Sequence, residues 1–145
     1  MSVKQISVFL ENAPGSLMAF CRVLREHQID MRALNVAETT EYGVMRLITD
    51  DLATTMKVLA EEDYIAKTTD VLVMELDDTP GALVAMLSVL SDAKININYF
   101  YAALLRAEGK AYLVAKVSDV QAAEKVLADA GYHPLSEEEF AGLLK

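Results

Sequence analysis

The chain contains only one cysteine, Cys21, among 145 residues. A single thiol can form neither an internal disulfide nor a metal site with several cysteine ligands, and it is typical of proteins from a reducing compartment. Basic residues are also few: 13 lysines and arginines oppose 22 aspartates and glutamates, which gives a net charge of −9. Because such an acidic surface repels phosphate groups, we expect neither nucleic acid nor a membrane as partner.

Long apolar runs are scarce as well. The best run, from Gly81 to Leu90, is far shorter than the roughly 20 residues of a membrane span. The N-terminal residues lack the apolar stretch of a signal peptide. These features predict a cytoplasmic protein.

Catalytic motifs are missing from the sequence. It has no Walker A motif, dinucleotide-binding glycine pattern, HExxH motif or nucleophile elbow. Cys21 shares a helical stripe with Leu17 and Leu24, which favours a core thiol over a nucleophile. His27 and His133 have no partners at fixed spacing, so we assign them structural or surface roles. The sequence therefore predicts a protein that is not an enzyme and has no cofactor and no metal site.

What the sequence does contain is an internal repeat. The pairs Pro14-Gly15 and Pro80-Gly81 lie 66 residues apart, and many apolar positions match at that offset, as does Gly43 with Gly109. From Asp51 and Asp119 onward the offset is 68. So many matches in one order indicate a duplication, with residues 1–69 and 70–145 as the two copies.

Each copy has the pattern of a βαββαβ unit. Alternating apolar residues, such as Ile6, Val8 and Leu10, predict strands, and apolar residues at helical spacing follow them. We place the proline of each Pro-Gly pair in a first helical turn. The fold class is α+β: two ferredoxin-like domains with antiparallel sheets in the order 4-1-3-2 and both helices on one face. Ser136 and Glu139 resemble a capping box, which predicts a short C-terminal helix.

The helix-free face of each sheet should be partly apolar. The residues expected there are Leu34, Val36, Val71, Val73 and Phe100. We expect the other repeat or a second chain to cover them, because a unit of about 70 residues has little core to spare. In the run Tyr99-Phe100-Tyr101, successive side chains must alternate, so Phe100 and the tyrosines should face opposite sides. An alternative is that one tyrosine lines a ligand pocket.

The start of the first helix in each copy is the one position with implied chemistry. A strand ends in Asn or Asp, Pro-Gly follows, and a helix begins. Free backbone amides there, together with the helix dipole, make a site for a small carboxylate. The amides expected to be free are those of Gly15, Ser16, Leu17, Gly81, Ala82 and Leu83.

At these residues the sequence resembles the ACT domain family. The resemblance rests on residues 10–17 and 76–83, and on the strand starts Ile29-Asp30-Met31 and Ile95-Asn96-Ile97. It covers nearly the whole chain twice and implies a stand-alone pair of ACT domains. The family typically binds amino acids or other small metabolites, and its domains commonly pair through their second strands. A ligand then lies between the first loop of one domain and the second strand of its neighbour.

The resemblance implies a regulatory protein with an amino acid or similar carboxylate as ligand, and a homodimer. The implied ligand-binding residues are Glu11, Asn12, Ala13, Gly15, Ser16, Leu17, Asp30, Asp78, Thr79, Gly81, Ala82, Leu83, Asn96 and Asn98. The alternative is a ligand-free module that dimerises and acts on a partner enzyme of amino-acid metabolism.

The two expected sites differ in charge. If the copies pair through their second strands in one chain, one site combines Asn12 with Asn96 and the other combines Asp78 with Asp30. An Asn amide can donate to a carboxylate, whereas an ionised Asp only accepts. We therefore expect the Asn site to bind the amino acid. Pairing between identical copies of two chains would mix the residues, and the asymmetry would fade.

Overall fold

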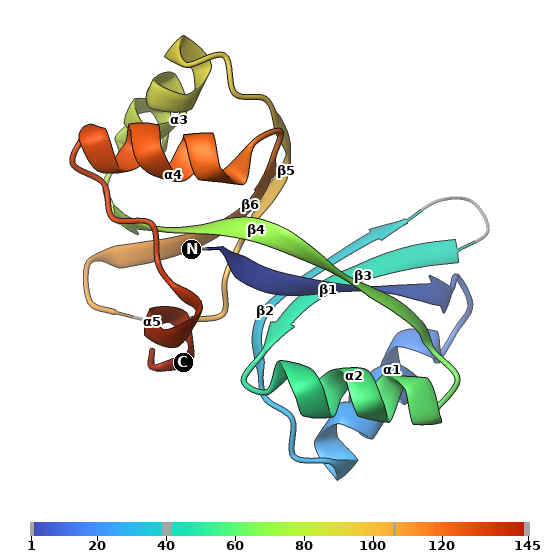
Figure 1. Ribbon diagram of the computed structural model, residues 1–145. Helices are drawn as coiled ribbons and strands as arrows, with labels where there is room; N and C mark the ends of the chain where they lie inside the picture. The colour runs from blue at the N-terminus through green and yellow to red at the C-terminus, as the bar shows by residue number, and fades with distance from the viewer. Residues whose placement is uncertain (1, 39–41, 106, 144–145) are drawn as a thin grey trace. The chain divides into compact units, whose positions relative to one another are not determined.

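The computed structural model describes residues 2–38, 42–105 and 107–143. They form two compact units, one of Lys4–Thr69 and one of Asp70–Lys145 together with Met1–Val3 (Figure 1). Among these residues, no helix is both long enough and apolar enough to span a bilayer.

The first unit contains β1 (Val3–Glu11), α1 (Ser16–Glu26), β2 (Met31–Glu38), β3 (Tyr42–Thr49), α2 (Leu52–Glu61) and the beginning of β4 (Ile65–Asp77). Its strand order is β2-β3-β1-β4, which confirms the predicted 4-1-3-2 order. β1 and β2 both pair antiparallel with β3, so they run parallel to each other.

The second unit contains the rest of β4, α3 (Ala82–Asp92), β5 (Ile97–Ala102), β6 (Lys110–Val117), α4 (Val120–Asp129) and α5 (Glu137–Ala141). Its strands run in the order β4-β6-β5, with antiparallel pairing on both sides of β6. Helices α3 and α4 pack against each other.

The last strand that the βαββαβ pattern predicts for the second copy is nearly absent. Only an isolated bridge joins Met74 to Pro134, followed by a hydrogen bond from the Leu135 amide to the Val73 carbonyl. Pro134 has no N–H to donate to a ladder, which limits the pairing. The chain continues into α5, where the capping box of Ser136 and Glu139 confirms the predicted C-terminal helix.

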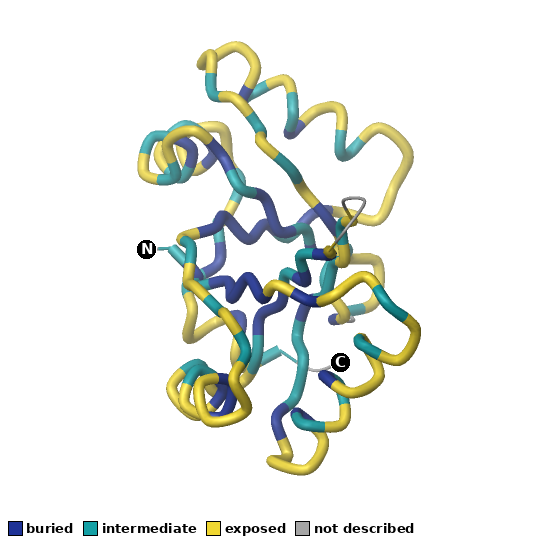
Figure 2. The backbone as a smooth tube through the Cα atoms, turned by 90° about the vertical axis from the view of Figure 1, so that its right-hand side faces the viewer, coloured by how far each residue is buried: buried dark blue, intermediate teal, exposed yellow. Residues whose placement is uncertain are grey.

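A separate core lies between sheet and helices in each unit. The first core is built around Ile6, Phe20, Leu24, Leu47 and Leu59. The second is built around Leu72, Met74, Met86, Leu90 and Leu127. Figure 2 shows the same layering, with buried residues concentrated in the strands and exposed residues along the outer sides of the helices.

The duplication is visible in the backbone. Gln28 and Lys94 both have positive φ, 57° and 59°, at offset 66. Asp51 and Asp119 cap α2 and α4 in the same way, each accepting a hydrogen bond from a backbone amide three residues later. The two copies therefore share these backbone conformations and helix caps.

One sequence match is wrong. Gly43 does not correspond to Gly109: Gly43 lies within β3, opposite Leu10, whereas Gly109 is in a turn with φ 71°. The residue opposite Leu76 is Ala111, so the offset is already 68 there. The extra residues thus lie in the hairpin before β6.

A bulge near the start of the second strand changes which side chains face the core. The register of β2 shifts between Met31 and Ala33, and that of β5 shifts between Ile97 and Tyr99. A shift of one residue turns every later side chain to the opposite face. Strict alternation from the strand start therefore fails in both copies.

For this reason Leu34, Val36 and Phe100 lie on the helix side, not on the helix-free face as predicted. Their cross-strand partners are the core residues Leu47, Met45 and Ala115. Val36 and Phe100 remain 47% and 46% exposed.

Val71 and Val73 do alternate with the core residues Leu72 and Met74, and both are buried. In the second unit, α5 lies on the opposite side of the sheet from α3 and α4 (Figure 1). Phe140 of α5 is buried.

The apolar stripe of α1 is less buried than predicted. Phe20 and Leu24 are fully buried, but Cys21 is half-buried and Leu17 is 43% exposed. Leu87 is half-buried at the position equivalent to Cys21. Burial raises the pKa of the Cys21 thiol, which lowers the share of reactive thiolate at neutral pH and agrees with a packing role.

Candidate functional site

The loop before α1 is a tight turn of type II. Pro14 precedes Gly15, which has φ 85° and ψ −10°, and the Ser16 amide donates to the Ala13 carbonyl at 3.2 Å. A positive φ at the third turn position requires glycine or a similarly tolerant residue, and proline suits the second. Pro14 therefore lies before the helix, and its predicted place in the first helical turn is wrong.

The second copy repeats this turn almost atom for atom. Gly81 has φ 87° and ψ −11°, and the Ala82 amide donates to the Thr79 carbonyl at 3.2 Å. The amides of Ser16 and Ala82 are thus engaged, and the prediction that they are free is wrong. The reason is that the type II turn at Pro-Gly uses the amide of its fourth residue as a hydrogen-bond donor.

The amides of the next residues, Leu17 and Leu83, still point out of the helix starts. Neither α1 nor α3 carries an acidic residue in its first turn. In contrast, α5 has three glutamates there. No acidic side chain within the first turn of α1 or α3 therefore offsets the positive end of the helix dipole, which favours a bound anion.

The other half of the predicted site lies at the start of the second strand. The Asp30 amide donates to the Asp50 carboxylate, and the Asp50 amide donates back to the Asp30 carbonyl, both at 3.0 Å. In the second copy, Asn96 and Ser118 make the equivalent pair of bonds at 3.1 and 2.9 Å. Both strand starts are therefore held rigidly by the loop after the third strand.

Within one unit these two halves lie at opposite ends of the sheet. Glu11, at the end of β1, is opposite Tyr42, and the neighbouring Gly43 is opposite Glu38 at the end of β2. Met31, at the start of β2, is opposite Thr49 at the far end. The 11 residues of α1 span about 16 Å between the two halves. A site that combines loop and strand start needs a second unit.

Two ion pairs alter the charge of the acidic half-sites. Arg32 Nε lies 3.5 Å from the carboxylate of Asp30. Lys110 Nζ lies 2.6 Å from the carboxylate of Asp77, and this contact raises the pKa of Lys110. The sequence did not predict the Lys110–Asp77 ion pair, because the two residues are far apart in the chain. Asp78 carries the remaining negative charge of its loop, and its amide donates to the Gly109 carbonyl.

The bulges place Arg32 and Asn98 at equivalent positions of β2 and β5. Asn98 is exposed. The two copies thus differ at two equivalent positions of the second strand, with Asp30 and Arg32 in one and Asn96 and Asn98 in the other. Arg32 was not among the predicted site residues.

The aromatic run is divided between the two faces as predicted. Tyr99 and Tyr101 stack with ring centroids 6.5 Å apart, and Tyr101 is buried. Phe100 faces the helix side. The alternative that one tyrosine lines a ligand pocket stays a prediction.

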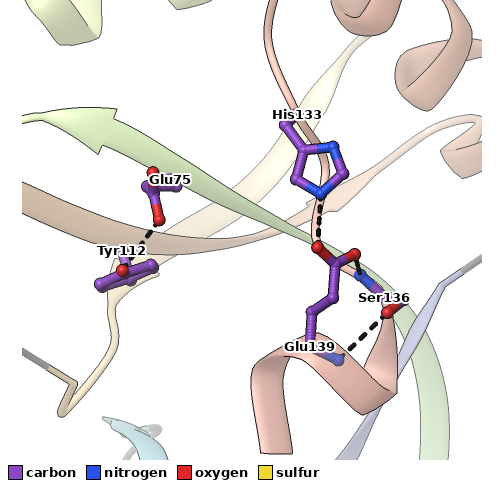
Figure 3. A network of polar contacts seen from close by, with 5 residues as sticks. All are labelled: Glu75, Tyr112, His133, Ser136 and Glu139. Carbon is purple, nitrogen blue, oxygen red and sulfur yellow. Dashed lines mark hydrogen bonds and ion pairs between the residues drawn. The ribbon is translucent and has the colours of Figure 1, made fainter. Parts of the chain in front are cut away.

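A polar network lies elsewhere in the second unit (Figure 3). The Tyr112 hydroxyl donates to Glu75 at 2.8 Å, and burial together with this bond raises the pKa of Tyr112. Glu139 pairs with the His133 ring and accepts from the Ser136 amide at 3.1 Å. No group of three potential metal ligands occurs within residues 2–38, 42–105 and 107–143.

The Glu139 contacts give a pH-dependent stability. The bond with His133, and after it the bond from the Ser136 amide, lower the pKa of Glu139 below its ordinary value of 4.5. Because the pKa of Glu139 is lower in the folded state, the stability that its ionised form contributes is complete above pH 4.5. It is lost as the pH falls through the lower folded value.

We expect His133→Ala to raise the NMR titration midpoint of Glu139 and His27→Ala to leave it unchanged. An unmoved midpoint in His133→Ala would rule out this cause.

Comparison with known proteins agrees with this architecture. A family model described as an ACT domain pair matches residues 1–144. A solved structure of a Bacteroides thetaiotaomicron protein is 30% identical over 99% of this chain and 98% of that one, with a TM-score of 0.91. The ligand-free regulatory subunit of aspartate kinase from Thermus thermophilus is 15% identical over 90% and 93%, with a TM-score of 0.63. At that identity the likeness shows the fold alone. No curated protein matches the chain.

Proposed function

Because the chain belongs to the ACT domain pair family, we propose that it is a regulatory protein that binds an amino acid. The α-carboxylate binds at the start of α1 or α3, and the ligand lies between the first loop of one domain and the second strand of its neighbour. We assign residues 1–69 and 70–145 to the two domains. The ligand-contacting groups are those of the two loops and the two strand starts described above.

One observation carries this proposal. In both copies a helix start without acidic residues lies at one end of the sheet, and a rigid polar strand start lies at the other. Two domains that pair antiparallel through their second strands bring opposite ends together. Each loop then meets the strand start of the neighbouring domain. A zwitterionic ligand fits there, because amides bind its carboxylate and side-chain oxygens bind its ammonium group.

The proposal includes no catalytic role. The half-buried Cys21, the one thiol of the sequence, packs against the first core. Its unpaired thiol suits a reducing compartment, and we propose the cytoplasm. The second candidate function is a ligand-free module that controls a partner enzyme of amino-acid metabolism.

Thermal-shift measurements with each amino acid test the binding function. A ligand at 100 times its Kd stabilises the folded state by about 2.7 kcal/mol, which raises the melting temperature by several degrees. We expect one amino acid, or a group of similar ones, to have this effect. Glycinamide, which lacks the carboxylate, is the control. No response to any amino acid would refute the binding function and favour the ligand-free module.

A further inference from the structure

A polar hollow lies in the second unit, where β6 ends and α4 begins. Its volume is about 410 Å³, and it is lined by Asp70 and by residues 116–121. The latter run from the end of β6 into the first turn of α4. Asp70 belongs to β4, two positions before Leu72, whose partner on β6 is Ala115. Sites for small ligands usually have about 300–1,000 Å³, so this hollow is large enough to hold one.

The hollow is separate from the ligand-binding loops. The loop of Asp78 follows the other end of β4, where Asp77 is opposite Lys110. Of the described residues that line the hollow, none belongs to the loops and strand starts assigned to amino-acid binding above. A ligand here would therefore occupy a further site, and the inference goes beyond the proposed function.

Opposite charges line this hollow without pairing with each other. The Lys116 ammonium donates to the Val117 carbonyl at 3.2 Å, and the Asp119 carboxylate accepts from the Ala122 amide at 3.0 Å. In the described part of the chain, no carboxylate lies within ion-pair distance of Lys116. Each charge therefore keeps the capacity to bind a group of opposite sign on a ligand.

The first copy shows which of the two charges the fold itself requires. At offset 68, Asp119 matches Asp51, and both cap a helix. Lys116 matches Ile48, which is buried. The carboxylate is thus explained by the helix start, whereas the same strand position folds with an apolar residue in the first copy. The ammonium group of Lys116 is a feature of the second copy that the fold does not need.

We propose that this hollow binds a small zwitterion, a molecule that carries one carboxylate and one ammonium group. Lys116 donates to the carboxylate, and Asp119 accepts from the ammonium group. Asp70 adds a second carboxylate to the wall and strengthens the attraction for the ammonium group. The amide of Gln121, exposed on the first turn of α4, donates to or accepts from either end. Free amino acids and short peptides both have this pair of charges, at different spacings.

NMR titration of the full chain tests the site. Each amino acid and glycylglycine serve as zwitterionic probes, while acetate and methylammonium carry only one of the two charges. We expect at least one zwitterion to shift the amide signals of residues 116–121 in a saturable way, and the single-charge probes to shift them at least tenfold more weakly at equal concentration. Whether an amino acid or glycylglycine binds more tightly identifies the class of zwitterion.

Two variants remove one charge each. Lys116→Gln removes the ammonium group, and Asp119→Asn removes the carboxylate but keeps a good N-cap for α4. Each should weaken binding at the hollow by about ten- to hundredfold, since each removes a hydrogen bond between charged groups. The matched controls should bind as the wild type does. They are Lys125→Gln, at an exposed position of α4, and Asp51→Asn, at the equivalent cap of the first copy.

Each outcome decides the matter. Saturable shifts that are lost in both charge variants and kept in both controls support the site. No shift at residues 116–121, shifts that persist in both charge variants, or equal shifts with acetate or methylammonium alone would overturn it. The proposed function is read from other signals, those of residues 12–17 and 78–83. Shifts only in these loops refute the hollow, whereas shifts only at the hollow refute the loop sites.

Discussion

Asn12→Ala is expected to weaken amino-acid binding by about ten- to hundredfold. A hydrogen bond to a charged group contributes about 1.5–3 kcal/mol, and the Asn12 amide can donate one to the ligand carboxylate. Titration calorimetry on the wild type and the variant measures the loss directly.

The matched control is Asp78→Ala in the other loop. An ionised Asp78 cannot donate to a carboxylate, and its charge opposes the roughly 0.3–1 kcal/mol that a helix start offers an anion. We expect binding at the Asn12 site to be unchanged in this variant. An equal loss in both variants, or a loss only in Asp78→Ala, would show that the wrong loop was chosen.

The ion pairs in the structure refine the reason for this asymmetry. Arg32 offsets Asp30, and Lys110 offsets Asp77. The repulsion at the second loop is therefore carried mainly by Asp78, because the charges of the other two aspartates are offset. Asp78→Asn, which restores the residue type of the first loop, should let that loop bind the same ligand more tightly.

The repeated elements could be predicted from the sequence because local chemistry sets them. Asp51 and Asp119 have the side chains that N-caps require, and Gly15 and Gly81 have the freedom that positive φ requires. These signals act over a few residues. They stay readable in a single sequence.

The sequence could not predict which face of the sheet each side chain of β2 and β5 points to, because a bulge has no sequence signature of its own. Met31 and Leu34 both pack on the first core although they are three positions apart, which strict alternation forbids. The register shift that allows this is set by pairing with β3, a long-range contact. The same limit hid the Lys110–Asp77 ion pair, which depends on the register of β4 against β6.

The site itself could be predicted only in halves. The sequence placed the loop and the strand start in one motif, but their positions at opposite ends of the sheet follow from β1 and β2 being parallel. Because the loop and the strand start of one domain lie at opposite ends of its sheet, a ligand that contacts both a loop and a strand start needs two domains.

Phe20→Ala is expected to have the largest effect on stability, about 3–5 kcal/mol. Phe20 is fully buried in the first core, and its ring meets that of Tyr64 edge to face at 5.2 Å. Truncation removes this contact and leaves a cavity between α1 and the sheet. Urea unfolding measures the change in free energy.

The variant also tests whether the two units are separate folding domains, as we propose. Phe20 belongs to the first core and its equivalent, Met86, to the second. Amide hydrogen exchange should therefore accelerate in residues 4–69 for Phe20→Ala and in residues 70–145 for Met86→Ala. Strand β4 runs through both units and is the segment most able to couple them. If either variant accelerates exchange equally in both units, the chain folds as one cooperative unit and the proposed boundary near residue 69 has no thermodynamic meaning.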